Sequence, residues 1–129
     1  MNFYFSKKVT NQNFEEAIEN VTEALKVEGF GILTLIDVKE TFKKKLDVDF
    51  KKYIILGACN PSFAHKALLH EDKIGVFLPC NIVIEEHENG EVEVSAVDPA
   101  ASLSPVKNKN IESIASEIQQ KLKSIIESL

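Results

Sequence analysis

The end of the chain carries one unbroken apolar stripe. Apolar residues recur there at spacings of three and four, which places all of them on one face of a helix: Ile111, Ile114, Ala115, Ile118, Leu122, Ile125, Ile126 and Leu129. Such a helix persists in water only when its stripe is buried. The chain must therefore offer an apolar surface to this helix, which is either its own sheet or a partner subunit.

The rest of the chain has the size and composition to supply a core. A length of 129 residues indicates a single domain spanning residues 1–129. Hydrophobic residues make up 44% of the chain and charged residues 27%, which is typical of a globular protein and argues against disorder.

The first part of the chain is predicted to fold as strand, helix and strand. Asn2–Val9 interleaves polar and apolar residues, as a strand does. Asn13, with Glu16 three residues later, is typical of a capping box at the start of a helix, and Gly29 supplies its left-handed stop. Phe30–Ile36 is rich in β-branched and aromatic residues and is predicted to be a strand covered on both faces.

Two shorter helices are predicted in the middle of the chain. Asp37 caps the first, with Phe42 and Leu46 facing inward and lysines outside. After a compact apolar strand over Tyr53–Ala58, Asn60-Pro61 begins the second, because proline in the first turn loses no needed hydrogen bond. This helix runs to about His70, and its buried stripe is expected to consist of Ala64, Ala67 and Leu68.

The following segment is predicted to contain a hairpin. Ile74–Glu86 is expected to be extended, with Pro79 at a bulge or an edge because proline cannot donate to a central ladder. Asn89-Gly90 favours a type I′ turn, and Glu91–Val97 then alternates as a half-solvated strand. Asp98-Pro99 predicts a short helical turn.

The order of these elements is β-α-β-(α)-β-(α)-β-β-α. It predicts an α+β domain in which helices pack on a largely antiparallel sheet.

Charge argues against nucleic-acid binding. Fifteen basic residues against twenty acidic ones give a net charge of −5, and the chain contains no arginine. An acidic balance repels phosphate backbones, and without arginine no bidentate reader of guanine is available. The chain also shows no apolar run long enough for a membrane span and no secretory signal, which favours a cytoplasmic protein.

The strongest candidate for chemistry is the segment Gly57-Ala58-Cys59-Asn60-Pro61, where a buried strand passes into a helix start. Backbone N–H groups at a helix N-terminus lower the pKa of a nearby thiol, so Cys59 is a candidate nucleophile, redox sensor or metal ligand. The alternative is that Cys59 is simply a small buried hydrophobe, as cysteines commonly are.

A second segment, Leu78-Pro79-Cys80-Asn81, resembles the first and suggests a joint site. Cys59, Cys80 and His65, with His87, make a candidate zinc set if the fold brings them together. The alternative is that His87 and its neighbouring glutamates form a solvated hairpin surface. No phosphate loop, dinucleotide fingerprint, nucleophile elbow or metalloprotease motif is present.

These segments resemble a known family. Glu28-Gly29-Phe30-Gly31, Ile55–Pro61, Leu78–Val83 and Val97–Ala101, in this order and spacing, look like domain of unknown function 302. The resemblance implies a TBP-like fold with a curved antiparallel sheet, homodimers and no settled activity. Its motif positions correspond here to Gly57, Cys59, Asn60, Pro61, Pro79, Cys80, Asn81, Asp98 and Pro99. Ser102 stands where many members carry methionine, so a thioether ligand is not expected there.

The sequence favours a non-enzymatic, homodimeric domain that binds a small ligand where Cys59-Asn60-Pro61 approaches Pro79-Cys80-Asn81. Asn60 and Asn81 would offer polar groups among apolar walls, while Gly57 and Asp98 would border the site. No cofactor is expected beyond a possible metal ion. Two alternatives remain open: a thiol redox or metal-handling protein using Cys59 and Cys80, and a purely structural or interaction subunit.

Overall fold

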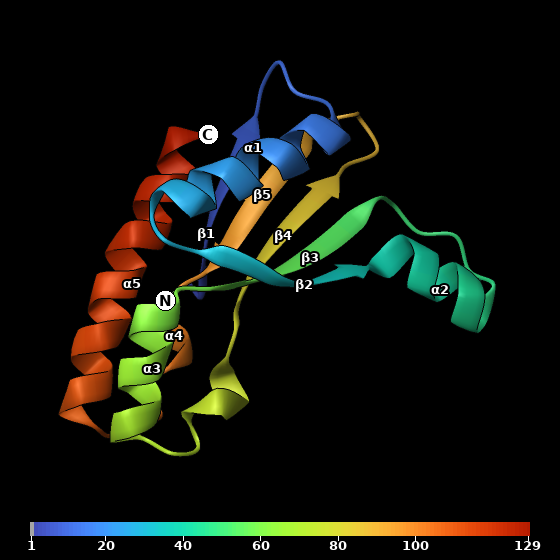
Figure 1. Cartoon of the computed structure of the whole chain (residues 1–129). Helices are drawn as coiled ribbons and strands as arrows, with labels where there is room; N and C mark the ends of the chain where they lie inside the picture. Colours follow the sequence, from blue (N-terminus) through green and yellow to red (C-terminus); the bar gives the residue numbers. More distant parts are fainter. Residues whose placement is uncertain (1) are drawn as a thin grey trace.

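Five antiparallel strands form one sheet in the order β1-β5-β4-β3-β2 (Figure 1). A computed structural model describes residues 2–129. The strands are β1 (Tyr4–Val9), β2 (Gly31–Asp37), β3 (Tyr53–Cys59), β4 (Cys80–Glu86) and β5 (Val92–Val97).

Helices cover one face of this sheet and extend beyond one of its ends (Figure 1). They are α1 (Phe14–Val27), α2 (Val38–Leu46), α3 (Pro61–His70), the 3₁₀ turn η1 (Ile74–Phe77), α4 (Pro99–Ser102) and α5 (Lys109–Ser128). The predicted fold class, an α+β domain with helices packed on an antiparallel sheet, is confirmed. Among residues 2–129, no helix is both long enough and apolar enough to cross a lipid bilayer.

The core lies between the sheet and the helices α1 and α5. Alternate residues of the central strands point into it, including Ile84, Val94 and Ala96. The apolar stripe of α5 is buried against α1, α3, α4 and the sheet of the same chain, and Leu122 at its centre is inaccessible to solvent. The surface that this helix requires is therefore supplied by its own chain.

The ends of α1 follow the sequence prediction. The Glu16 amide donates to Asn13 Oδ1 over 2.8 Å, and the Asn13 amide donates to Glu16 Oε1 over 3.0 Å, which completes the capping box. Gly29 after the helix has a φ of 85°, in the region that glycine adopts without steric cost.

The prediction that Phe30–Ile36 is covered on both faces is wrong. β2 is an edge strand that pairs only with β3, and Leu33 and Leu35 are 66% and 56% exposed. A continuous apolar run predicts that its faces will be covered, but it does not say whether the covering group belongs to the same chain.

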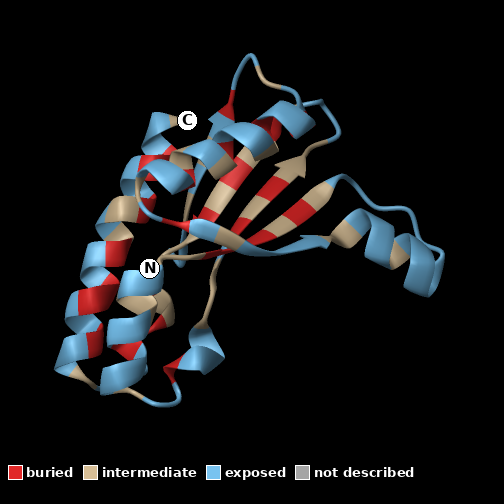
Figure 2. Ribbon diagram, in the orientation of Figure 1, coloured by how far each residue is buried: buried red, intermediate tan, exposed pale blue. Residues whose placement is uncertain are grey.

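The prediction that Phe42 and Leu46 face inward is also wrong. No residue of α2 is buried, and Leu46 is 65% exposed. The helix stands beyond the edge of the sheet as part of a projecting arm, which is drawn in exposed and intermediate colours in Figure 2. We call β2, α2 and the following loop to Phe50, residues 31–50, the arm.

The stripe of α3 differs from the prediction in one respect. Ala67 is buried and Ala64 half-buried, but Leu68 is 45% exposed, and Phe63 packs against the core in its place. The helix is short and touches mainly α5, so only a narrow stripe is covered.

The segment before β4 is not continuously extended. It contains η1, and Pro79 lies after this turn and directly before the first residue of β4. β4 is a central strand between β3 and β5, and it tolerates the proline because Pro79 precedes the hydrogen-bonded ladder.

The hairpin turn is not of type I′. Gly90 has a φ of 86°, but Asn89 keeps a negative φ, and the Gly90 amide donates to the His87 carbonyl over 2.9 Å. The connection is therefore one residue longer than a two-residue type I′ loop allows, and only its glycine adopts a left-handed conformation.

Candidate functional site

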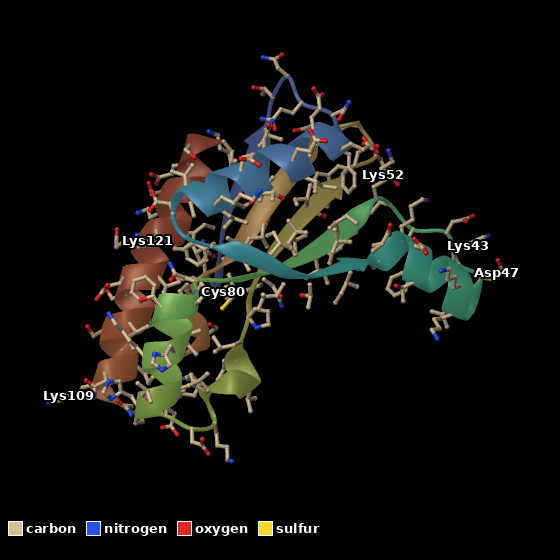
Figure 3. The ribbon with its side chains drawn as sticks, viewed as in Figure 1. Lys43, Asp47, Lys52, Cys80, Lys109 and Lys121 are labelled. Carbon is tan, nitrogen blue, oxygen red and sulfur yellow. The ribbon has the colours of Figure 1, made fainter. Side chains whose placement is uncertain are left out.

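Both cysteines lie where the sheet meets α3. Cys80, which is labelled in Figure 3, pairs with Ala58 across the β3–β4 ladder, and Cys59 is the next residue along β3. Together with Asn60 they line a small apolar cavity whose other walls include Phe63 and Ile118. The register therefore brings the Cys59-Asn60 and Cys80-Asn81 segments next to each other on adjacent strands, and a ligand there stays a prediction.

The cavity beside the cysteines is small. Its volume is about 30 Å³, whereas pockets for small molecules are usually about 300–1,000 Å³. This position is thus not a preformed pocket for a small organic ligand.

Burial raises the pKa of both thiols. Burial is the main cause at both residues. The pKa of Cys80 rises to about 11, and the neighbouring Cys59 thiol adds to this shift. The direction is opposite to the lowering expected beside a helix N-terminus, because burial disfavours the charged thiolate. Both cysteines are free thiols, and at neutral pH they are protonated.

The amide of Asn60 already has backbone partners. Its Oδ1 accepts from the Phe63 amide at the start of α3, and its Nδ2 donates to the Glu28 carbonyl over 3.3 Å. Asn60 therefore joins the start of α3 to the end of α1, while the adjacent Pro61 occupies the first turn of α3 as predicted.

Asp98 also has a local structural role. Its Oδ1 accepts from the Ala100 amide over 3.0 Å and from Gln119 Nε2 of α5 over 3.1 Å. The carboxylate thus caps α4, which begins at the buried Pro99, and ties that helix to α5.

Gly57 allows β2 and the segment before β4 to approach β3 closely. A Cβ added at Gly57 would lie 2.8 Å from Cγ of Pro79, and it would come closer still to Oγ1 of Thr34 on β2. Gly57 and Pro79 thus form a packing contact between β3 and the segment that leads into β4.

The predicted zinc set is not assembled. His65 is exposed on α3 and does not join the cysteines in a cluster of potential ligands. Within residues 2–129, the one group of three His, Cys, Asp or Glu side chains whose ligand atoms lie within 4.8 Å of one another is Glu85, His87 and Glu93.

A larger cleft lies on the face of the sheet opposite to the core. Its volume is about 350 Å³, and it includes one of the predicted residues, Asn81. Most of its walls are aromatic or aliphatic, and its polar groups are few. The residues that line it are Phe3, Tyr4, Tyr53, Asn81, Val83, Glu85, Glu93, Ser95, Ala96 and Val97. We call this the open-face cleft.

The cleft is acidic at one end, where Glu85 and Glu93 lie opposite each other. Lys51 Nζ pairs with Glu85 Oε1 at 2.6 Å, and His87 Nε2 lies 2.8 Å from Glu93 Oε1. Hydrogen bonds from Ser6 and His87 lower the pKa of Glu93, so its carboxylate is ionised at neutral pH.

Most cleft residues were not predicted from the sequence. The signal available was the alternation of β5, which places Glu93, Ser95 and Val97 on one face. Only the strand register shows that Glu93 lies opposite Glu85 and Ser95 opposite Val83, so the alternation within one strand could not predict which residues line the cleft.

Residues 5–129 match the family described as "Domain of unknown function DUF302". The chain belongs to this family. The same relationship is seen among solved structures. The crystal structure of an uncharacterized conserved protein DUF302 from Bacillus stearothermophilus superposes with a TM-score of 0.90 and 30% sequence identity, covering 98% of each chain. No protein of curated function matches the chain. The TBP-like assignment implied by the resemblance stays a prediction.

Replacing Gly57 with alanine should destabilise this DUF302 domain by about 1–3 kcal/mol, because the new methyl group must displace Thr34 or Pro79. Urea unfolding measures the loss. Gly75→Ala is the matched control, since a Cβ there meets nothing within 4 Å. Equal stability of both variants would contradict the packing role.

Alkylation of Cys80 by iodoacetamide should be slow in the folded protein at neutral pH and should accelerate as the pH rises toward about 11. Mass spectrometry of a Cys59→Ser variant measures the rate at Cys80 alone. In urea the same thiol should titrate near its ordinary pKa of ~8.5. A folded-state rate that has already reached its plateau at neutral pH would restore the thiolate hypothesis.

Proposed function

We propose that this DUF302 domain binds a small molecule in the open-face cleft. The observation that carries the proposal is a hollow of about 350 Å³ with mostly apolar walls and a few polar groups among them, the usual make-up of a ligand site. Of the two asparagines expected to contact a ligand, Asn81 lies in this cleft. The ligand is thus placed on the outer face of the sheet, next to the Pro79-Cys80-Asn81 segment.

The walls favour a flat apolar or aromatic molecule that carries an amino group. Tyr4 and Tyr53 offer aromatic surface, while Glu85 and Glu93 supply carboxylates at one end of the cleft. An ammonium group is attracted both by carboxylates and by the faces of aromatic rings. An anionic ligand of the same size would meet the two carboxylates and be repelled.

Binding is favoured over thiol chemistry by the state of the cysteines. The raised pKa of both thiols leaves no activated nucleophile beside α3. The redox alternative therefore has less support than the binding function, and the predicted cytoplasmic location stays a prediction.

The arm is proposed to bind a second copy of the chain. Leu33, Leu35 and Leu46 are each more than half exposed, and all three lie within the arm. Isolated helices as short as α2 are marginal without tertiary packing, and α2 buries no residue within its own chain. A projecting apolar surface of this kind is typical of a subunit interface.

Charge complementarity supports a second copy as the partner. α2 carries Lys43, Lys44 and Lys45, and the β4–β5 hairpin of the same chain carries Glu86, Glu88 and Glu91. Lys43, Lys44 and Glu91 are paired within the chain, so Lys45, Glu86 and Glu88 are the charges that a partner would meet. In a two-fold dimer each surface can face the opposite charge on the other subunit. Lys43 pairs with Asp47 at 3.0 Å near the tip of the arm, far from the rest of the chain (Figure 3).

The cleft can be tested with two phenylalkyl probes of similar size and opposite charge, 2-phenylethylamine and 3-phenylpropionate. The amine should shift the NMR signals of Asn81, Val83 and Ser95, because its ammonium group meets the two carboxylates. The acid should not. Ser95→Lys should abolish the shifts by filling the cleft with a cation, whereas Ser116→Lys on the exposed side of α5 should not. No shifts with either probe, or equal shifts with both, would contradict the proposed ligand class.

Two lysines on the apolar arm, Leu35→Lys with Leu46→Lys, should convert a dimer into monomers, because charges on an apolar interface are left unpaired. Sedimentation equilibrium measures the mass. The control is Leu69→Lys on α3, which is 71% exposed but lies outside the arm. A monomeric parent protein, or a dimer that survives the double substitution, would show that the arm has another role.

A further inference from the structure

We infer that Glu85, His87 and Glu93 form a binding site for a divalent transition-metal ion of the zinc type. The site lies at the acidic end of the open-face cleft and uses neither cysteine. It is a different set from the one that the sequence suggested. Its metal binding is measurable without any organic ligand, so it does not depend on the proposed small-molecule function.

The register of the sheet places two carboxylates directly opposite each other. Glu85 on β4 pairs with Glu93 on β5, and their side chains lie on the same face. Like charges directly opposite across a ladder destabilise a sheet. The Glu85 and Glu93 side chains are only 16% and 23% exposed, and their charges are already partly compensated by Lys51 on Glu85 and by Ser6 and His87 on Glu93. A divalent cation between the two carboxylates would offset the repulsion that remains.

The hairpin turn adds a nitrogen ligand to this pair. His87 follows β4, and its Nε2 lies 2.8 Å from Glu93 Oε1. Zn²⁺ binds both imidazole nitrogens and carboxylate oxygens, and a site with three protein ligands leaves a fourth tetrahedral position open. Here the open position would face the cleft.

Neighbouring side chains already contact the two carboxylates that would bind the metal ion. Ser6 donates to Glu93 Oε2, which leaves Oε1 directed at His87. Lys51 holds Glu85 through Oε1, and a carboxylate has a second oxygen available. Groups that hydrogen-bond metal ligands orient them and adjust their affinity. A metal ion would replace the direct His87–Glu93 contact and leave the Ser6 contact in place.

The test is titration of the full chain, stripped of metal with a chelator, with Zn²⁺ alone by calorimetry and with Co²⁺ by visible absorption. We expect about one ion per chain. His87→Ala and Glu93→Gln should each weaken metal binding by about tenfold or more. Even residues that only hydrogen-bond a metal ligand typically lower the affinity by about tenfold when they are replaced, so loss of a direct ligand should cost at least as much. Glu93→Gln preserves the shape of the side chain and its hydrogen bond with Ser6, so it separates loss of a ligand from loss of folding. Circular dichroism checks both variants.

Two matched controls remove the same chemical groups elsewhere. His65→Ala removes an exposed histidine on α3, and Glu88→Gln removes an exposed carboxylate from the same hairpin. Both should bind Zn²⁺ like the parent chain. The inference is overturned if the parent chain binds neither ion, if the controls weaken binding as much as the site variants, or if only Cys59→Ser with Cys80→Ser abolishes it.

Discussion

Burial of the α5 stripe against the apolar face of the sheet is the interaction on which the rest of the structure depends. Leu122 lies at the centre of this contact, opposite a sheet face that includes Val94 and Ile84, all of them inaccessible to solvent. Because α1 packs beside α5 on the same face, the helices use one side of the sheet for the core. The other side is left free for the open-face cleft, so the position of the candidate site follows from the one-sided packing.

The residues that carry the family resemblance are explained largely by packing and capping. Gly57 makes room for Thr34 and Pro79, Asn60 joins α3 to α1, and Asp98 joins α4 to α5. The Asn60 and Asp98 contacts thus join helices to one another. The Gly57–Pro79 contact lies next to the start of β4, the strand from which Asn81 and Glu85 reach the open face.

Two surfaces of the chain carry groups that invite a binding partner: the acidic end of the cleft, and the arm. Glu85 and Glu93 are paired in register with like charge, and the arm exposes leucines that its own core does not cover. Like charges in register weaken a sheet, and an exposed apolar patch marks an interaction surface. A divalent cation at the first would offset the repulsion that Lys51, Ser6 and His87 leave, and a second subunit at the second would cover the leucines.

The sequence by itself determined the element order, the capping box of Asn13 and Glu16, the helix starts at Asn60 and Asp98, and the buried stripe of α5. These features depend on neighbours within a few residues, where spacing and cap chemistry are decisive. Tertiary structure alone decided that β2 is an edge, that α2 leaves the core, that the thiols are desolvated, and that Glu85 meets Glu93. Each of these depends on strand order, register or burial, which join residues distant in the sequence and leave no local pattern.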